Sequence, residues 1–222
     1  MRMRRILRHS IIKTLYFNFK ILPIKQAIRL PFDLCGKVRL ENLSGRVKLN
    51  FDEVTPGMLK IGTQGSDMFP ASETVVSIEG DITFCGRFVM GMGSSLICRR
   101  GGSIVFGDNT IIGARTLLFC EKEIILDDGF LTSWDCQIMD SDTHYIIDMQ
   151  ANSPATSKKE ISIGKHVWIG NGVIINKGTK LPSDSIVASR SLCNKNYMAE
   201  GTNCVFAGSP AKVVTRNKKW TL

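Results

Sequence analysis

Apolar residues recur every six positions through much of the chain, and small or turn-forming residues stand beside them. Each six-residue unit begins with an apolar residue, has a small or turn-forming residue second, and has a small or apolar residue fifth. Four segments of two such units align: residues 84–95, 106–117, 126–137 and 163–174. Three units make a triangular coil of about eighteen residues, and one coil cannot bury its apolar face alone. The pattern therefore predicts an all-β fold of stacked coils, a parallel β-helix.

The spacing of the units shows one interruption. Phe84 and Phe106 are 22 residues apart, and Leu126 follows Phe106 by 20, whereas Ile163 follows Leu126 by 37. The extra residues fall in the polar segment 140–159, which contains no six-residue unit. A long insertion in a regular repeat is typical of a functional or disordered loop. A β-sandwich is disfavoured because its turns do not recur at multiples of six.

The first 30 residues follow a different pattern. Apolar residues stand at helical spacing, and Pro23 and Pro31 end the pattern; these residues are Leu7, Ile11, Ile12, Leu15, Tyr16 and Phe19. We expect an N-terminal helix followed by irregular, strand-rich chain. The predicted organisation is an N-terminal basic arm and lead-in region at 1–76, then a β-helix domain at 77–222 with the insertion and a short C-terminal tail.

Charge is concentrated in the arm. The 222 residues carry a net charge of +9, and residues 1–30 hold eight Lys or Arg with no Asp or Glu. The remainder is nearly neutral, which argues against a nucleic-acid partner. A basic arm with an apolar stripe is suited to anionic lipid. The alternative interpretation is a helix packed on the end of the β-helix with solvated charges.

The cysteines indicate neither a metal site nor a redox site. The seven cysteines are never closer than eleven residues, so no Cys-x-x-Cys motif exists. No signal peptide is evident, and we expect reduced thiols in a cytoplasmic protein, with peripheral contact at the inner face of the membrane if the arm binds lipid. We expect no bound metal, because the Asp140-x-Asp142-x-His144 pattern has no third ligand cluster.

Two segments resemble a known family. Val167–Ile175, which contains Trp-Ile-Gly, and Ala207–Val213, which contains Gly-Ser-Pro-Ala-Lys, are similar to the hexapeptide-repeat acyltransferases. The similarity covers about residues 78–216. It is strongest to the galactoside and maltose O-acetyltransferases and to the surface-polysaccharide O-acetyltransferases. This resemblance implies a left-handed β-helix, a homotrimer, and acetyl-CoA in the groove between neighbouring β-helices.

Acyl transfer from a thioester to a hydroxyl needs a base and a slot that aligns both substrates. Histidine suits the base because its unperturbed pKa is about 6.5. The resemblance assigns this role to His144 in the insertion, whereas His166 occupies a repeat corner and His9 lies in the arm. Asp140 and Asp142 flank His144. They are predicted to bind the acceptor, with orientation of the imidazole or capping of a turn as alternatives.

The resemblance also indicates the cofactor site. Asn171 and Ser189 match positions that contact the pantetheine of acetyl-CoA. Lys195 and Lys212 match basic residues near its phosphates, although each is also plausible as surface charge. The bulky Arg190 departs from the Gly that many relatives have there. None of the cysteines has a histidine partner that would make it a nucleophile, so direct transfer is preferred.

The expected function is acetyl-CoA-dependent O-acetylation of a sugar or glycan hydroxyl in surface-polysaccharide biosynthesis. The N-terminal segment 1–31 resembles polysaccharide-cluster acetyltransferases, which favours a sugar acceptor. Two alternatives remain open: a serine or antibiotic O-acetyltransferase of the same fold, and a non-catalytic solenoid scaffold.

Overall fold

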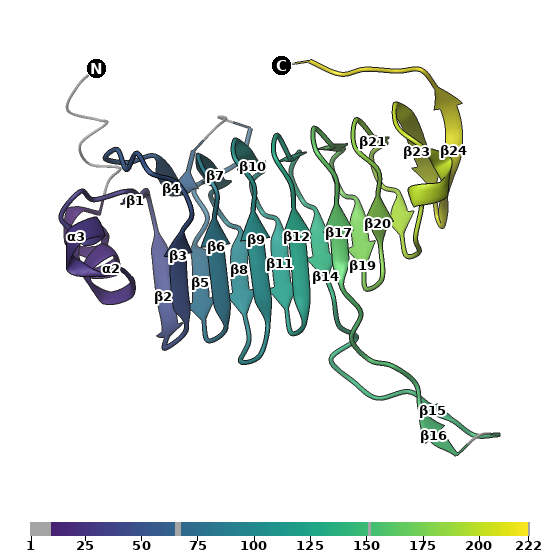
Figure 1. Ribbon diagram of the computed structural model, residues 1–222, viewed down its shortest axis with the longest axis horizontal. Helices are drawn as coiled ribbons and strands as arrows, with labels where there is room; N and C mark the ends of the chain where they lie inside the picture. Colours follow the sequence, from purple (N-terminus) through teal and green to yellow (C-terminus); the bar gives the residue numbers. More distant parts are fainter. Residues whose placement is uncertain (1–9, 65–67, 151, 222) are drawn as a thin grey trace.

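The computed structural model describes residues 10–64, 68–150 and 152–221, and residues 1–9, which include His9 and four arginines of the arm, lie outside this description. Within the described residues, the chain passes in turn through three sheets that form the sides of a prism (Figure 1). The predicted all-β left-handed parallel β-helix is confirmed.

The bounds of the elements follow the sheets. The nine-stranded sheet contains, in spatial order, β1 (Phe32–Leu34), β4 (Leu59–Thr63), β7 (Phe88–Gly91), β10 (Thr110–Ile112), β13 (Leu131–Thr132), β18 (Trp168–Ile169), β21 (Ile186–Val187), β23 (Cys204–Gly208) and β24 (Ala211–Arg216). The seven-stranded sheet contains β2 (Val38–Leu43), β5 (Thr74–Ile78), β8 (Ser95–Cys98), β11 (Leu117–Cys120), β14 (Gln137–Met139), β19 (Ile174–Asn176) and β22 (Leu192–Cys193). The six-stranded sheet contains β20 (Lys180–Leu181), β17 (Ile161–Ile163), β12 (Glu123–Leu126), β9 (Ser103–Phe106), β6 (Asp81–Phe84) and β3 (Arg46–Leu49).

The first residues of the six-residue units form the core. Phe84, Phe106, Leu126 and Ile163 are register partners on successive coils, and all are buried. The rings of Phe84 and Phe106 stack with their centroids 5.1 Å apart. Inward-pointing residues thus contact their equivalents one coil away, as the six-residue period predicts.

The coils begin earlier than predicted. β1, β2 and β3 pair in parallel with β4, β5 and β6, so the prism starts at Phe32 and not at residue 77. The period is hard to see in this part of the sequence because the links between strands are irregular. Residues 50–58 form turns, and the register of β2 shifts between Leu40 and Leu43.

A helical cap covers the N-terminal end of the prism, as Figure 1 shows. It consists of α2 (Ile11–Ile21) and the short α3 (Ile24–Ala27), on either side of Pro23. Buried Asn18 binds the exposed edge of β1: its Nδ2 donates to the Phe32 carbonyl at 2.9 Å, and the Phe32 N–H donates back to Oδ1 at 3.1 Å. The expected N-terminal helix is present, and within the described residues no helix is long and apolar enough to span a membrane.

Two further features depart from the regular coil. At the C-terminal end, η1 (Met198–Glu200) precedes an antiparallel hairpin of β23 and β24. The insertion leaves the prism after β14 and returns at β17. It carries the antiparallel pair β15 (Ile147–Asp148) and β16 (Ser153–Pro154), which projects well beyond the prism (Figure 1).

Candidate active site

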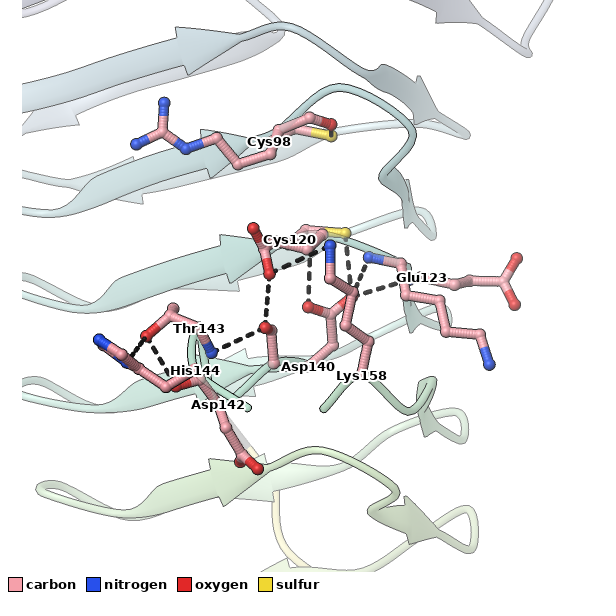
Figure 2. Close-up of polar contacts among 12 residues, drawn as sticks. Cys98, Cys120, Glu123, Asp140, Asp142, Thr143, His144 and Lys158 are labelled. Atoms are coloured by element: carbon pink, nitrogen blue, oxygen red, sulfur yellow. Dashed lines mark hydrogen bonds and ion pairs between the residues drawn. The ribbon is translucent and has the colours of Figure 1, made fainter. Parts of the chain in front are cut away.

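Asp140 anchors the first end of the insertion. The residue is fully buried, and its carboxylate accepts hydrogen bonds from the backbone N–H groups of residues 121–123 at 2.7–2.9 Å. The Cys120 thiol donates to the same carboxylate at 3.3 Å (Figure 2). Both carboxylate oxygens of Asp140 thus accept hydrogen bonds from the neighbouring coil. The prediction that Asp140 binds the acceptor is therefore corrected: its carboxylate caps a turn, which was the alternative.

A second clamp joins the two ends of the insertion. The Ser141 hydroxyl donates to Glu121 Oε2 at 2.5 Å, and Lys158 Nζ lies 3.3 Å from the same oxygen. The hydrogen bond from Ser141, followed by the charge of Lys158, lowers the pKa of Glu121. The Lys159 N–H also donates to the Asp140 carbonyl at 2.9 Å. Both ends of the loop are thus fixed to one coil.

Asp142 ties the loop to the next coil. Its carboxylate forms an ion pair with Lys177, whose Nζ also donates to the Thr156 carbonyl at 2.6 Å. The Asp142 N–H donates to the Ser157 carbonyl at 2.9 Å. Asp142 is thus paired with a cation of its own chain, and its observed role is to hold the loop in place.

The imidazole of His144 lies beyond these clamps and is exposed. Thr143 Oγ1 donates its single hydrogen to the Asp142 carbonyl at 2.6 Å, and the same oxygen lies 3.0 Å from His144 Nδ1. A threonine hydroxyl has only one hydrogen, so when it donates to the Asp142 carbonyl its oxygen can accept from the imidazole. This arrangement suits the tautomer with its proton on Nδ1 and a lone pair on Nε2.

Backbone strain accompanies this arrangement. Thr143 has φ +61°, a left-handed conformation that is an outlier for a β-branched side chain. Strain of this kind costs about 1–3 kcal/mol and tends to concentrate at functional sites. Figure 2 shows the His144 side chain pointing away from Asp140.

Two of the predicted cofactor residues meet on another corner of the prism. Ser189 Oγ donates to Asn171 Oδ1 at 2.7 Å, and the Arg190 N–H donates to the Asn171 carbonyl at 2.9 Å. These residues follow β18 and β21, between the nine- and seven-stranded sheets. The insertion leaves between the seven- and six-stranded sheets. One chain therefore does not bring His144 to the Asn171–Ser189 corner.

The two predicted lysines lie apart from this corner. Lys195 is exposed after β22, and its Nζ lies 5.2 Å from the centroid of the Tyr197 ring. Lys212 is exposed on β24. That these two lysines bind the phosphates of acetyl-CoA therefore stays a prediction.

A further cluster was not foreseen from the sequence. His166 Nδ1 lies 2.9 Å from Asp184 Oδ1, and the Trp220 indole stacks on the imidazole with centroids 4.3 Å apart. The Trp220 Nε1 donates to the His166 carbonyl at 2.9 Å. His166 and Trp220, together with Arg87 and Asn109, line a cavity of about 330 Å³. The repeat predicts His166 at a corner, but nothing in the sequence brings the C-terminal tail to it.

The two cysteines next to the insertion, Cys120 and Cys136, are not activated as nucleophiles. Cys136, which lies near the start of the insertion, is buried, and burial raises the pKa of its thiol to about 11. The hydrogen bond that Cys120 donates to Cys98, followed by burial, raises the pKa of the Cys120 thiol. Thiols of this kind stay protonated at neutral pH and react poorly. Among the residues that the structure describes, no three His, Cys, Asp or Glu side chains are grouped to hold a metal ion.

Comparison with known proteins points to acetyltransferases. No protein-family model matches the sequence. The chain is 29% identical over 126 residues to the polysialic acid O-acetyltransferase of Escherichia coli O1:K1 / APEC, which is 56% of this chain and 40% of that protein. The chain thus spans less than half the length of this relative.

Two solved structures share the fold. The polySia-specific acetyltransferase NeuO has a TM-score of 0.51 and 23% identity, covering 86% of this chain and 79% of that one. The polysialic acid O-acetyltransferase OatWY has a TM-score of 0.51 and 22% identity, covering 83% and 70%. These proteins confirm the resemblance to the hexapeptide-repeat acyltransferases, and to their surface-polysaccharide O-acetyltransferases, that the Trp-Ile-Gly and Gly-Ser-Pro-Ala-Lys segments indicate.

Proposed function

We propose that this chain is an acetyl-CoA-dependent O-acetyltransferase that modifies a hydroxyl of a sugar or glycan. The observation that carries the proposal is the exposed His144 imidazole, which stands on a clamped insertion with Nδ1 3.0 Å from Thr143 Oγ1. We infer that Thr143 Oγ1 accepts the Nδ1 proton, which would leave the Nε2 lone pair free. A lone pair held in this way is what a general base needs to accept a hydroxyl proton. The similarity to a polysialic acid O-acetyltransferase supports a glycan acceptor in surface-polysaccharide biosynthesis.

The transfer would proceed in one displacement through a tetrahedral state. Nε2 of His144 takes the proton of the acceptor hydroxyl while that oxygen forms a bond to the thioester carbonyl carbon. The carbon–sulfur bond then breaks, and the imidazolium returns the proton to the departing CoA sulfur. No acyl-enzyme is needed, which agrees with the raised pKa of Cys136.

The Asn171–Ser189 corner is the proposed cradle for the pantetheine of the donor. Both side chains are polar, they bond to each other, and Ser189 is exposed. The ammonium groups of Lys195 and Lys212 would face the CoA phosphates, since a cation is the ordinary partner of a phosphate.

A second copy of the chain would complete the site, because His144 and Asn171 lie on different corners. Two faces of the prism are suited to contact a neighbouring chain, because aligned and partly exposed apolar side chains cover them. On the nine-stranded sheet these side chains are Val89, Ile111, Leu131, Trp168 and Ile186. On the seven-stranded sheet they are Ile97, Phe119 and Met139. On the third face, Arg46, Asp81 and Glu123 point outward. We propose a homotrimer in which the insertion of each chain reaches the Asn171–Ser189 corner of the next.

The proposed compartment is the cytoplasm. All seven cysteines are free thiols, and Cys98 and Cys120, which are register partners on neighbouring coils, are not joined as a disulfide. Persistent free thiols are typical of a reducing compartment.

The test is CoA release from acetyl-CoA with a panel of acceptors: polysialic acid, neutral oligosaccharides, serine and chloramphenicol. His144→Gln is compared with His166→Gln, because His166 has an aspartate partner and is the rival base. We expect His144→Gln to lower kcat by about 10²–10⁴ and His166→Gln to keep activity with a sugar acceptor. Full turnover by His144→Gln would remove His144 from this role. Turnover with serine or chloramphenicol but no glycan would favour those acceptors, and absence of CoA binding would favour a scaffold.

A further inference from the structure

The helical cap exposes an apolar face to solvent. On α2, Ile12 is 82% exposed and Phe19 is 47% exposed. Ile11, Leu15 and Tyr16 are exposed between them on the same side, since positions three and four apart share one face of a helix. Ile24 and Ile28 extend the apolar surface over α3.

The opposite face of α2 is fixed to the prism, so the exposed residues cannot turn inward. Phe17 and Asn18 are buried, and the Phe17 ring meets Phe32 edge-on at 5.1 Å. Thr14 Oγ1 accepts the Leu34 N–H at 3.0 Å, and Asn18 pairs with the Phe32 backbone. These contacts set the rotation of the helix about its own axis. An apolar patch held outward in this way is typical of an interaction surface.

The charges that α2, α3 and the residues next to them carry are all positive. Lys20, Lys25 and Arg29 are exposed at its margin, and the first acidic residue of the whole chain is Asp33. Within the described residues, no carboxylate lies within salt-bridge distance of these three cations. Glu41 shares a surface hollow with Lys20, but its own carboxylate pairs with Arg39 at 2.9 Å. Positive potential therefore persists around the apolar face.

We propose that the cap, defined as α2 and α3, is a docking surface for an anionic lipid bilayer. An apolar helix face flanked by Lys and Arg lies in the plane of a membrane interface, with the apolar side chains among the acyl chains and the cations near the headgroups. Anionic lipid is the partner that the surface fits, because α2 and α3 carry only basic charges around the apolar face, and an apolar protein partner would not require this. The cap would hold the N-terminal end of the prism at the membrane, independently of any transferase activity.

The test uses the full-length protein and vesicles of phosphatidylcholine alone or mixed with phosphatidylglycerol. Two double variants remove the two components: Ile12→Asp with Phe19→Asp, and Lys20→Glu with Lys25→Glu. Val214→Asp is the matched control, because Val214 is 60% exposed at the other end of the prism. Circular dichroism and thermal melting verify that each variant is folded.

We expect cosedimentation only with the phosphatidylglycerol vesicles, and weaker cosedimentation at high salt. The apolar double variant should bind at least about tenfold more weakly. Loss of one basic charge should weaken binding by about fivefold, so the Lys20→Glu, Lys25→Glu double variant should bind at least about 25-fold more weakly. The Val214→Asp protein should bind like the parent.

Three results would overturn the proposal. The first is absence of binding to either vesicle. The second is equal binding to both vesicles, because the cations would then have no role. The third is self-association that Ile12→Asp with Phe19→Asp abolishes while vesicle binding stays absent, which would assign the cap to a second copy of this chain.

Discussion

Replacing Asp140 by Asn tests whether this residue is structural. The carboxylate accepts three backbone N–H groups, one on Oδ1 and two on Oδ2. An Asn side chain has one acceptor oxygen, so at best it keeps the two bonds of Oδ2 in neutral form and leaves the Glu121 N–H without an acceptor. A buried, unsatisfied N–H costs about 1–3 kcal/mol, and bonds to a charged acceptor are about twice as strong as neutral ones. Together these losses should lower the free energy of unfolding by about 2–5 kcal/mol.

The assay is urea unfolding at fixed protein concentration, with Asp142→Asn as the matched control. Asp142 forms a partly exposed ion pair with Lys177, so its loss should cost no more than about 1 kcal/mol. Hydrogen exchange should also become faster at the amides of residues 121–123 in the Asp140 variant alone. If Asp140→Asn leaves stability and exchange unchanged but raises the KM for the acceptor tenfold, the capping role is refuted and acceptor binding is restored.

Two further predictions concern the same loop. Thr143→Val removes the proposed acceptor for the Nδ1 proton of His144, so kcat should fall about tenfold while the KM for acetyl-CoA is unchanged. Thr143→Ser keeps the hydroxyl and should retain activity. Equal rates for the two variants would contradict the proposed tautomer. The lowered pKa of Glu121 stabilises the clamp at pH values above the ordinary glutamate value of 4.5, and this contribution is lost as the pH falls through the lowered pKa. Proteolysis of the insertion should therefore increase on acidification below pH 4.5 in the parent, and Glu121→Gln should be sensitive at every pH.

Much of the prism could be predicted because its core obeys one simple rule. Phe106 and Leu126 are register partners, and the six-residue period places both inward without knowledge of any neighbour. The six-residue pattern did not predict the first coils, and there is a physical reason for this. In β2 and β3 outward charged residues such as Arg39 and Arg46 alternate with core residues, and turns of irregular length separate the strands. A period-two pattern remains there, but the period of six is lost.

The site was less predictable, because sequence shows which groups are near in the chain but not where they point. Asp140 and Asp142 both precede His144, by four and by two residues, and look alike in sequence. Asp140 directly follows β14, so its side chain turns into the prism and caps residues 121–123. Asp142 lies beyond the clamp and reaches Lys177 on the next coil.

The clamps explain how an exposed loop can hold the proposed base, His144, in position. An insertion of this length would lose much conformational entropy if it were ordered only by substrate. The carboxylate of Asp140 and the Ser141–Glu121–Lys158 contacts fix its two ends during folding. The contacts of Asp142 and Thr143 extend this order up to His144. In the proposed trimer, a loop that is already fixed at both ends to its own prism would present the proposed base to a neighbouring chain at little further cost in conformational entropy.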